Sequence, residues 1–253
     1  MPSLGGKVAI VTGAAVGMGR AIAVAYGAEG ARVVVNYSKS RAEAEETAEE
    51  VRKAGGEPLL IGADVSSDEQ VRAMVAQTLD RFGRVDVLVN NAGITRFVPF
   101  EDLESLTDEV WDRLYAVNVK GTFFCCRAVA EPMRRQGEGR IINIASVSGL
   151  RPTGSSIAYA ASKAAVIQAS RCLAKALAPE IRVSVIAPGA IAETRWNAGR
   201  PTTPAAQQSA ANAIPLKRLG RPSDIAEVAL FLATGGDYLT GEVIVVDGGR
   251  ELG

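Results

Sequence analysis

The chain has 253 residues, of which 47% are hydrophobic, and its 28 basic side chains balance 28 acidic ones. This length and apolar content suit one large α/β domain with a filled core, and the balanced charge argues against a nucleic-acid partner. No apolar run approaches the ~20 residues that cross a bilayer, and residues 1–4 lead into a strand without a signal-peptide pattern, so we expect a cytoplasmic protein with no membrane partner.

The histidine and cysteine content excludes further kinds of catalytic, metal and redox site. The sequence contains no histidine, which removes His-based triads and His-ligated metals. Its three cysteines, Cys125, Cys126 and Cys172, lack the Cys-x-x-Cys spacing of metal and redox sites. We expect buried free thiols and no metal.

Short runs rich in Val and Ile alternate with longer helical segments along the whole chain. The predicted strands are residues 7–12, 32–36, 58–62, 85–89, 140–145, 181–186 and 243–246. The predicted helices are residues 20–29, 41–53, 67–82, 107–136, 155–178 and 223–234. This alternation predicts βαβ units and a parallel sheet covered by helices on both faces. No linker or repeat divides the chain, so we expect a single domain over residues 1–253.

A glycine-rich turn follows the first predicted strand. It reads Gly13-x-x-x-Gly17-x-Gly19 and leads directly into a predicted helix. Strand, glycine turn and helix in this order are typical of a dinucleotide site, because glycine lets the backbone approach a pyrophosphate. The alternative is a tight turn that needs glycine for steric reasons alone.

The second predicted strand ends at Asn36, about 20 residues beyond the glycines, where NAD-binding chains usually place Asp or Glu for the ribose. No carboxylate stands there to repel a 2′-phosphate, and Ser38, Lys39 and Arg41 follow and could meet one. The pattern favours NADP(H), with NAD(H) as the alternative. Lys39 and Arg41 also suit an ordinary solvated helix start.

Residues with chemical or turn-forming roles stand at or just past six predicted strand ends. They are Gly13, Asn36, Asp64, Asn90, Ser146 and Pro188. Ligands of parallel sheets bind at the carboxyl ends of the strands, and these ends share one edge of the sheet. We therefore expect the functional site at that edge.

Tyr159 and Lys163 lie four residues apart in an Ala-rich segment that is predicted to be helical, so they share one face. A cation near a tyrosine favours the phenolate and lowers the pKa of the phenol from its usual value of about 10. The pair indicates acid/base chemistry without histidine. A chance pairing at helical spacing is the alternative.

Taken together, these motifs resemble those of short-chain dehydrogenases/reductases, and the resemblance covers the whole chain. The residues that carry it are Thr12-Gly13-x-x-x-Gly17-x-Gly19, Asp64-Val65, Asn90-Asn91-Ala92-Gly93, Asn118, Ser146, Tyr159-x-x-x-Lys163 and Pro188-Gly189. It implies a doubly wound, Rossmann-like domain with a mostly seven-stranded parallel sheet. The segment at residues 34–37 and the one at residues 239–249 are most similar to 3-oxoacyl-[acyl-carrier-protein] reductases and glucose dehydrogenases.

The resemblance implies a catalytic set of Asn118, Ser146, Tyr159 and Lys163. Tyr159 would exchange the proton, and Ser146 would polarise the substrate carbonyl. Lys163 would lower the pKa of the tyrosine and hold the nicotinamide ribose. Asn118 would position a water that links Lys163 to solvent. Its alternative role is that of a helix kink residue bonded to its own backbone.

The resemblance also implies a nicotinamide dinucleotide cofactor. The residues expected to bind it are Gly13, Val16, Gly17, Met18, Gly19, Asn36, Tyr37, Ser38, Asp64, Val65, Asn90, Ala92, Gly93, Tyr159, Lys163, Pro188, Gly189, Ile191 and Thr194. Thr194 stands one residue later than in many relatives, which leaves its contact with the nicotinamide open.

Residues 190–215 are expected to form a substrate lid, since residues 195–215 combine Trp196 and three prolines with little regular apolar pattern. An ordinary exposed loop is the alternative. Candidate walls of the substrate pocket are Ile94, Thr95, Arg96, Val147, Ser148, Leu150, Arg151 and Trp196.

The expected activity is hydride transfer between nicotinamide and a ketone or secondary alcohol. The first candidate substrate is a 3-oxoacyl thioester, free or carrier-bound. A dehydrogenase of a small secondary alcohol, sugar or cyclic ketone is the enzymatic alternative. A cofactor-sensing or scaffold protein is the non-enzymatic one, although such a protein has no need for Ser146, Tyr159 and Lys163 together. Relatives suggest a homotetramer built through the long helices and the C-terminal strand.

Overall fold

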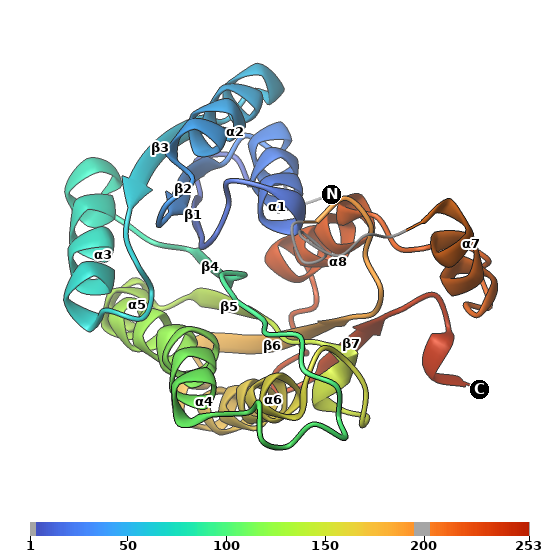
Figure 1. Ribbon diagram of the computed structural model, residues 1–253. Coiled ribbons are helices and arrows are strands. Elements are labelled where there is room, and N and C mark those ends of the chain that lie inside the picture. Colours follow the sequence, from blue (N-terminus) through green and yellow to red (C-terminus); the bar gives the residue numbers. More distant parts are fainter. Residues whose placement is uncertain (1–3, 195–202, 253) are drawn as a thin grey trace.

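A seven-stranded parallel sheet runs through the middle of the molecule (Figure 1). The computed structural model describes residues 4–194 and 203–252. The sheet order is β3-β2-β1-β4-β5-β6-β7, so the predicted parallel sheet is confirmed. The strands are β1 (Val8–Val11), β2 (Arg32–Tyr37), β3 (Glu57–Gly62), β4 (Val87–Asn90), β5 (Gly139–Ile144), β6 (Ile181–Pro188) and β7 (Val243–Val246).

Helices cover both faces of this sheet (Figure 1). On one face α1 (Gly17–Ala28) packs against both α2 (Arg41–Ala54) and α8 (Pro222–Thr234). On the other face α3 (Asp68–Phe82) packs against α5 (Thr122–Gln136), which in turn contacts α6 (Ile157–Leu177). Because both faces are covered, the central strands are almost continuous apolar runs, as the sequence pattern predicted.

The strand order reverses beside β1, which pairs with β2 on one side and with β4 on the other. In sheets of this kind the connecting loops diverge at such a point and leave a crevice at the carboxyl ends of the strands. The topology therefore places the loops after β1, β2 and β4 around one crevice.

The helix predicted for residues 107–136 has an irregular middle. It runs as α4 (Asp108–Leu114), a π-helical segment (Tyr115–Gly121) and α5. Asn118 lies inside the π-helical segment, and Gly121 ends it where a Cβ atom would come within 2.8 Å of Val65 Cγ2. Single π-helical turns inside helices are frequent at functional sites.

The predicted lid contains a helix that the sequence pattern did not reveal. α7 (Pro204–Asn212) starts at a proline, and the Thr203 hydroxyl accepts a hydrogen bond from the N–H of Ala206 at 3.2 Å. The helix has no buried residue, which explains why no apolar period marked it. Trp196 lies outside the described residues.

The expectation of buried thiols is correct for two of the three cysteines. Cys125 and Cys126 are buried on α5, whereas Cys172 on α6 is exposed. Burial raises the pKa of the Cys126 thiol to about 12 and raises that of Cys125 as well, so neither is an activated thiolate. No described helix is both long and apolar enough to cross a membrane.

Candidate active site

The glycine-rich turn joins β1 to α1, as predicted. Gly13 and Gly17 have φ angles of 60° and 58°, which residues with a Cβ atom rarely adopt. A Cβ atom on Gly19 would come within 2.5 Å of both the Asn91 Nδ2 atom and the Gly13 carbonyl oxygen. The first two glycines are therefore required by backbone conformation and the third by close packing.

No side chain caps the N-terminus of α1. Val16 occupies the capping position without a side-chain hydrogen bond, and the first turn contains no acidic residue. The amide groups of this turn and the positive end of the helix dipole are thus left for an anion. This local geometry suits a dinucleotide pyrophosphate.

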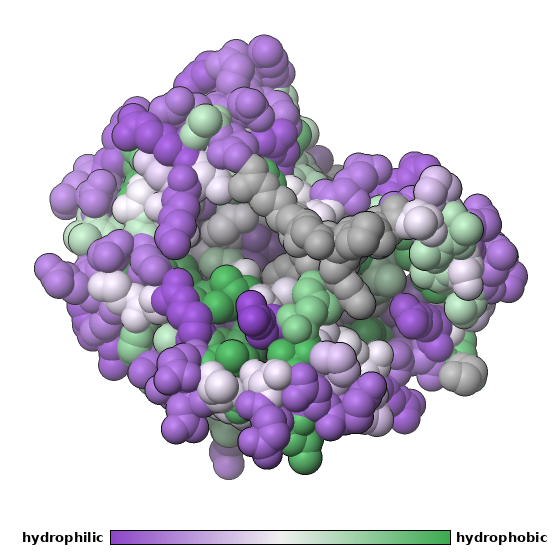
Figure 2. All heavy atoms as spheres, in the orientation of Figure 1, coloured by the Kyte–Doolittle hydropathy of each residue, from purple (hydrophilic) through white to green (hydrophobic). Residues whose placement is uncertain are grey.

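A cavity of about 480 Å³ lies at the carboxyl ends of the strands, next to this turn. The corresponding face of the molecule is hollowed at its centre (Figure 2). Its walls come from the loops after β1, β2, β3, β4 and β6, from α4 and from the π-helical segment that carries Asn118. They comprise Gly13, Ala15, Val16, Gly17, Met18, Asn36, Tyr37, Ser38, Lys39, Ser40, Ala63, Asp64, Val65, Asn91, Ala92, Gly93, Ile94, Thr95, Phe97, Arg113, Val117 and Thr194.

Most of the residues predicted to bind the cofactor line this cavity. The predicted residues in the described chain that do not line it are Gly19, Asn90, Tyr159, Lys163, Pro188, Gly189 and Ile191. Thr194 does line it and lies beside Gly17, where a Cβ atom would come within 3.5 Å of its Cγ2 atom. Its contact with a nicotinamide stays a prediction.

Asn90, which was predicted to bind the cofactor, and its neighbour Asn91 point their side chains in different directions. The Asn90 side chain points into the interior, where its Nδ2 donates to Asn143 Oδ1 at 2.8 Å. The Asn91 side chain lines the cavity and donates to the carbonyl oxygens of Thr12 and Gly13 at 2.9 and 3.0 Å. Neighbouring residues at a strand end face opposite sides, and the motif alone does not say which one faces inward.

Asn36 is a structural residue of the cavity floor. Its Oδ1 accepts from the N–H of Gly13 at 3.2 Å, and its Nδ2 donates to the carbonyl oxygens of Ile61 and Ala63 at 3.2 and 3.1 Å. The side-chain amide is therefore fully engaged with backbone. A preference for NADP(H) or NAD(H) would therefore depend on the residues that follow Asn36 and not on its side chain.

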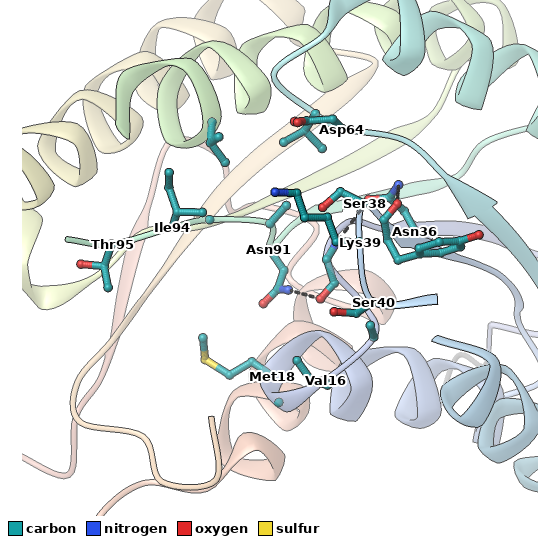
Figure 3. Close-up of a pocket in the computed structure, with 18 of the residues that line it drawn as sticks. Val16, Met18, Asn36, Ser38, Lys39, Ser40, Asp64, Asn91, Ile94 and Thr95 are labelled. Carbon is teal, nitrogen blue, oxygen red and sulfur yellow. Dashed lines mark hydrogen bonds between the residues drawn. The ribbon is translucent and has the colours of Figure 1, made fainter. Parts of the chain in front are cut away.

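Among the residues that follow Asn36, Lys39 is the one whose cationic side chain lies at the cavity. Lys39 reaches into it between Asp64 and Asn91 (Figure 3), and the structure shows no ion pair for this lysine within the described residues. Arg41, by contrast, donates to Glu45 at 2.9 Å and does not line the cavity. Of the two predicted cations, Lys39 is the one positioned for a ligand.

Arg113 also lines the cavity, although the sequence patterns did not single it out. It comes from α4, and its Nη2 lies 3.6 Å from the Asp64 carboxylate. Asp64 also accepts from the N–H and the hydroxyl of Ser66 at 2.9 and 2.7 Å. Burial raises the pKa of Asp64, but these contacts together hold it below its usual value. Only the tertiary fold brings α4 to this strand end.

Three of the four predicted catalytic residues lie together between β5 and α6. Ser156 caps α6 by accepting the N–H of Tyr159 at 3.2 Å, which fixes Tyr159 in the first turn. Ser146 follows β5, and its hydroxyl interacts with the Tyr159 phenol and acts to lower the pKa of that phenol. The Lys163 Nζ lies 5.9 Å from the centre of the Tyr159 ring and donates to the Ile144 carbonyl at 2.9 Å. The three side chains thus meet, as the sequence required.

The expected effect of Lys163 on the Tyr159 pKa is not what the structure shows. Burial raises the pKa of Tyr159 well above its usual value, and the Ser146 hydrogen bond only opposes this. Burial lowers the pKa of Lys163 itself to about 8. Tyr159 is therefore a protonated phenol at neutral pH, because burial disfavours the charged phenolate.

Asn118 bridges the cavity wall to the catalytic helix. Its Oδ1 accepts from the N–H of Ile94 at 2.9 Å, and its Nδ2 donates to the Ile94 carbonyl and to Ser162 Oγ, both at 3.0 Å. The residue is not satisfied by its own backbone, so the kink-residue alternative is wrong. Its predicted water-positioning role stays a prediction.

Ile94 connects the two halves of the site. It lines the cavity and also packs against the cluster that contains Tyr159. The phenol therefore borders the cavity wall through one apolar side chain.

The candidate substrate residues fall into separate groups. Ile94 and Thr95 line the cavity, whereas Arg96 does not. Ser148 lies beside Ser146, with its Oγ 3.2 Å from the Ser146 Oγ. Val147 is buried, Leu150 is exposed, and Arg151 pairs with Glu251 at 3.1 Å. Their contacts with a substrate stay predictions.

Comparison with known proteins matches nearly the whole chain. A family model described as enoyl-(acyl carrier protein) reductase matches residues 13–251. A 3-oxoacyl-[acyl-carrier-protein] reductase from Synechocystis sp. is 40% identical over 255 residues, covering 100% of both chains. A short-chain type dehydrogenase/reductase from Picea abies is 38% identical, covering 98% of this chain and 93% of that protein.

A solved structure supports the same similarity. The crystal structure of levodione reductase has a TM-score of 0.92 and 34% sequence identity, covering 98% of this chain and 99% of the other. The matched region therefore includes the sheet, the cavity and the cluster of Ser146, Tyr159 and Lys163.

Proposed function

The chain belongs to the short-chain dehydrogenase/reductase family, whose members use a nicotinamide cofactor, and from this premise we propose that it is an NADP(H)-preferring ketone reductase. The observation that carries the proposal is that the Ser146 and Tyr159 hydroxyls and Lys163 come together in one cluster, and that Ile94, which packs against the cluster containing Tyr159, also lines the cavity. One domain would hold both the cofactor and the substrate. We place the enzyme in the cytoplasm.

The geometry assigns a role to each of these side chains. A bound nicotinamide supplies the hydride. Ser146 and Tyr159 would donate hydrogen bonds to the carbonyl oxygen, where negative charge develops. The raised pKa of Tyr159 keeps its proton available at neutral pH, so the phenol serves as general acid in reduction. Lys163 would stabilise the phenolate that remains.

NADP(H) is favoured by the cavity wall after β2. Tyr37 and Ser38 put no carboxylate on this wall, and Lys39 is the cation beside them. A 2′-phosphate at this point would form a charge-assisted hydrogen bond with the ammonium. NAD(H) has no group to use that charge.

Lys39→Gln is expected to weaken NADPH binding by about tenfold, because one charge-assisted hydrogen bond is lost at an exposed position. NADH binding should change by less than about twofold, since NADH carries no 2′-phosphate. Fluorescence titrations with both cofactors measure the effect. Lys53→Gln, at an exposed position on α2, is the matched control. Equal losses for both cofactors would contradict the role of Lys39.

We propose 3-oxoacyl thioesters as the first substrate class, supported by the full-length similarity to a 3-oxoacyl-[acyl-carrier-protein] reductase. NADPH oxidation should be measured with acetoacetyl thioester, a cyclic diketone, glucono-lactone and crotonyl thioester. Fastest turnover with acetoacetyl thioester is expected. Preference for the cyclic diketone would assign a small-ketone reductase, and turnover of the crotonyl arm alone would assign C=C reduction. No consumption with any of them would refute the catalytic proposal.

A homotetramer stays a prediction. It is supported by exposed apolar side chains on the elements named for assembly, which include Phe123 on the long helix after β4 and Val245 on the C-terminal strand. Such residues are common at contacts between subunits.

A further inference from the structure

An arginine behind the glycine turn holds the turn in place without lining the cavity. The Arg20 guanidinium donates to the Ala15 carbonyl from Nε at 3.2 Å and from Nη2 at 3.0 Å. The Thr47 hydroxyl, which is fully buried on α2, lies 3.1 Å from the same oxygen and 3.0 Å from the Glu43 carbonyl oxygen. The Ala15 carbonyl oxygen thus contacts two side chains, Arg20 from α1 and Thr47 from α2.

The guanidinium is itself anchored on α2. It donates to the Thr47 hydroxyl at 2.9 Å, to Glu46 at 3.0 Å and to Glu50 at 3.3 Å. Because these contacts already restrict the Arg20 side chain, its guanidinium loses little further conformational entropy when it also binds the Ala15 carbonyl. Arg20 therefore ties the glycine turn to the helix that follows the Lys39 loop.

The contacts of Arg20 and Thr47 with the Ala15 carbonyl fix the orientation of the Ala15–Val16 peptide group. A trans peptide points its C=O and the following N–H in opposite directions. With the Ala15 carbonyl held toward α2, the N–H of Val16 points away from α2, and Val16 is a residue of the cavity wall. A cationic donor on the carbonyl also polarises the peptide and strengthens that N–H as a donor.

The start of the turn is held by other residues. Asn36 accepts from the N–H of Gly13 and Asn91 donates to the Gly13 carbonyl. These contacts leave the orientation of the Ala15–Val16 peptide to Arg20 and Thr47. We propose that Arg20 is a positioning residue for the cofactor pyrophosphate, acting through the Ala15 carbonyl. The inference rests on the proposed cofactor site.

The test compares ligands with and without a pyrophosphate. Arg20→Met keeps the aliphatic stem and removes the fork, and it is expected to weaken NADP⁺ binding by about tenfold in calorimetry, as loss of hydrogen bonds to a charged group would. Adenosine 2′-monophosphate, measured by displacement of NADPH, lacks the pyrophosphate and should change by less than about twofold. Thr47→Val, which removes the second contact, should produce a smaller loss of the same kind, and Arg20→Lys should restore part of the affinity.

Arg52→Met is the matched control, because Arg52 is also ion-paired with a glutamate of α2 but contacts no part of the turn. It should bind NADP⁺ as the wild type does. Unchanged NADP⁺ affinity in Arg20→Met would overturn the inference. Parallel weakening of both ligands with a lower unfolding midpoint would also overturn it, because that is the signature of general structural support. Failure of the wild type to bind any dinucleotide would instead refute the proposed function.

Discussion

Tyr159→Phe is expected to lower kcat for carbonyl reduction by roughly 10²–10⁴-fold, because it removes the general acid and keeps the ring. The ring is almost fully buried and packs near Ile94, so the fold should be unaffected. NADP⁺ affinity should fall by no more than about tenfold, the effect of one hydrogen bond. Steady-state kinetics and calorimetry on the same preparation separate the two effects.

Tyr115→Phe makes the same chemical change on the π-helical segment and should leave kcat unchanged. The pH dependence gives a second readout. Because the pKa of Tyr159 is raised, the wild type should keep its reductase activity across neutral pH, while alcohol oxidation, which needs the phenolate, should rise with pH. Activity of Tyr159→Phe close to that of the wild type would show that another group transfers the proton.

Lys163→Met is expected to abolish most of the turnover and to change how stability depends on pH. The folded protein releases the Lys163 proton near pH 8, whereas the unfolded chain holds it to a pH of about 10.4. Between these values the unfolded state binds more protons, so the free energy of unfolding of the wild type rises with pH. The variant lacks this contribution. Relative to the variant, the wild type should therefore gain about 2 kcal/mol between pH 7.5 and 9.5.

Urea unfolding of both proteins at several pH values in this range measures the gain. Tyr159→Phe is the control here, because it retains Lys163 and should show the same rise as the wild type. A difference between wild type and Lys163→Met that does not vary with pH would mean that the buried ammonium keeps its charge without cost. That result would remove the physical reason for a lysine poised beside the phenol.

The local features of the site could be predicted from the sequence. Strand, glycine turn and helix are set by neighbouring residues, and positive φ angles at Gly13 and Gly17 are a local demand. The spacing of Tyr159 and Lys163 places them on one helix face whatever the rest of the chain does. The parallel sheet followed from alternating patterns, and it brought Ser146 to the same edge as the turn.

Which neighbour of a pair faces the ligand was decided by packing. Positions 90 and 91 are both asparagine, yet only Asn91 lines the cavity, because the Asn90 side chain is hydrogen-bonded to Asn143 on the adjacent strand. The Asn36 amide is likewise engaged by β3 and the turn. Such hydrogen bonds join residues far apart in the chain, so no local pattern contains them.

By itself, then, the amino-acid sequence determined the family and the sheet and pointed to the hydroxyls and the amine that we propose as reacting groups, since each of these inferences depends on spacing along the chain. The tertiary structure alone decided the sign of the Tyr159 pKa shift, the position of Lys39 over the cavity and the hold of Arg20 on the turn. The reason is that desolvation and long-range hydrogen bonds depend on what surrounds a group in space, and that surrounding is assembled only when the helices close over the sheet.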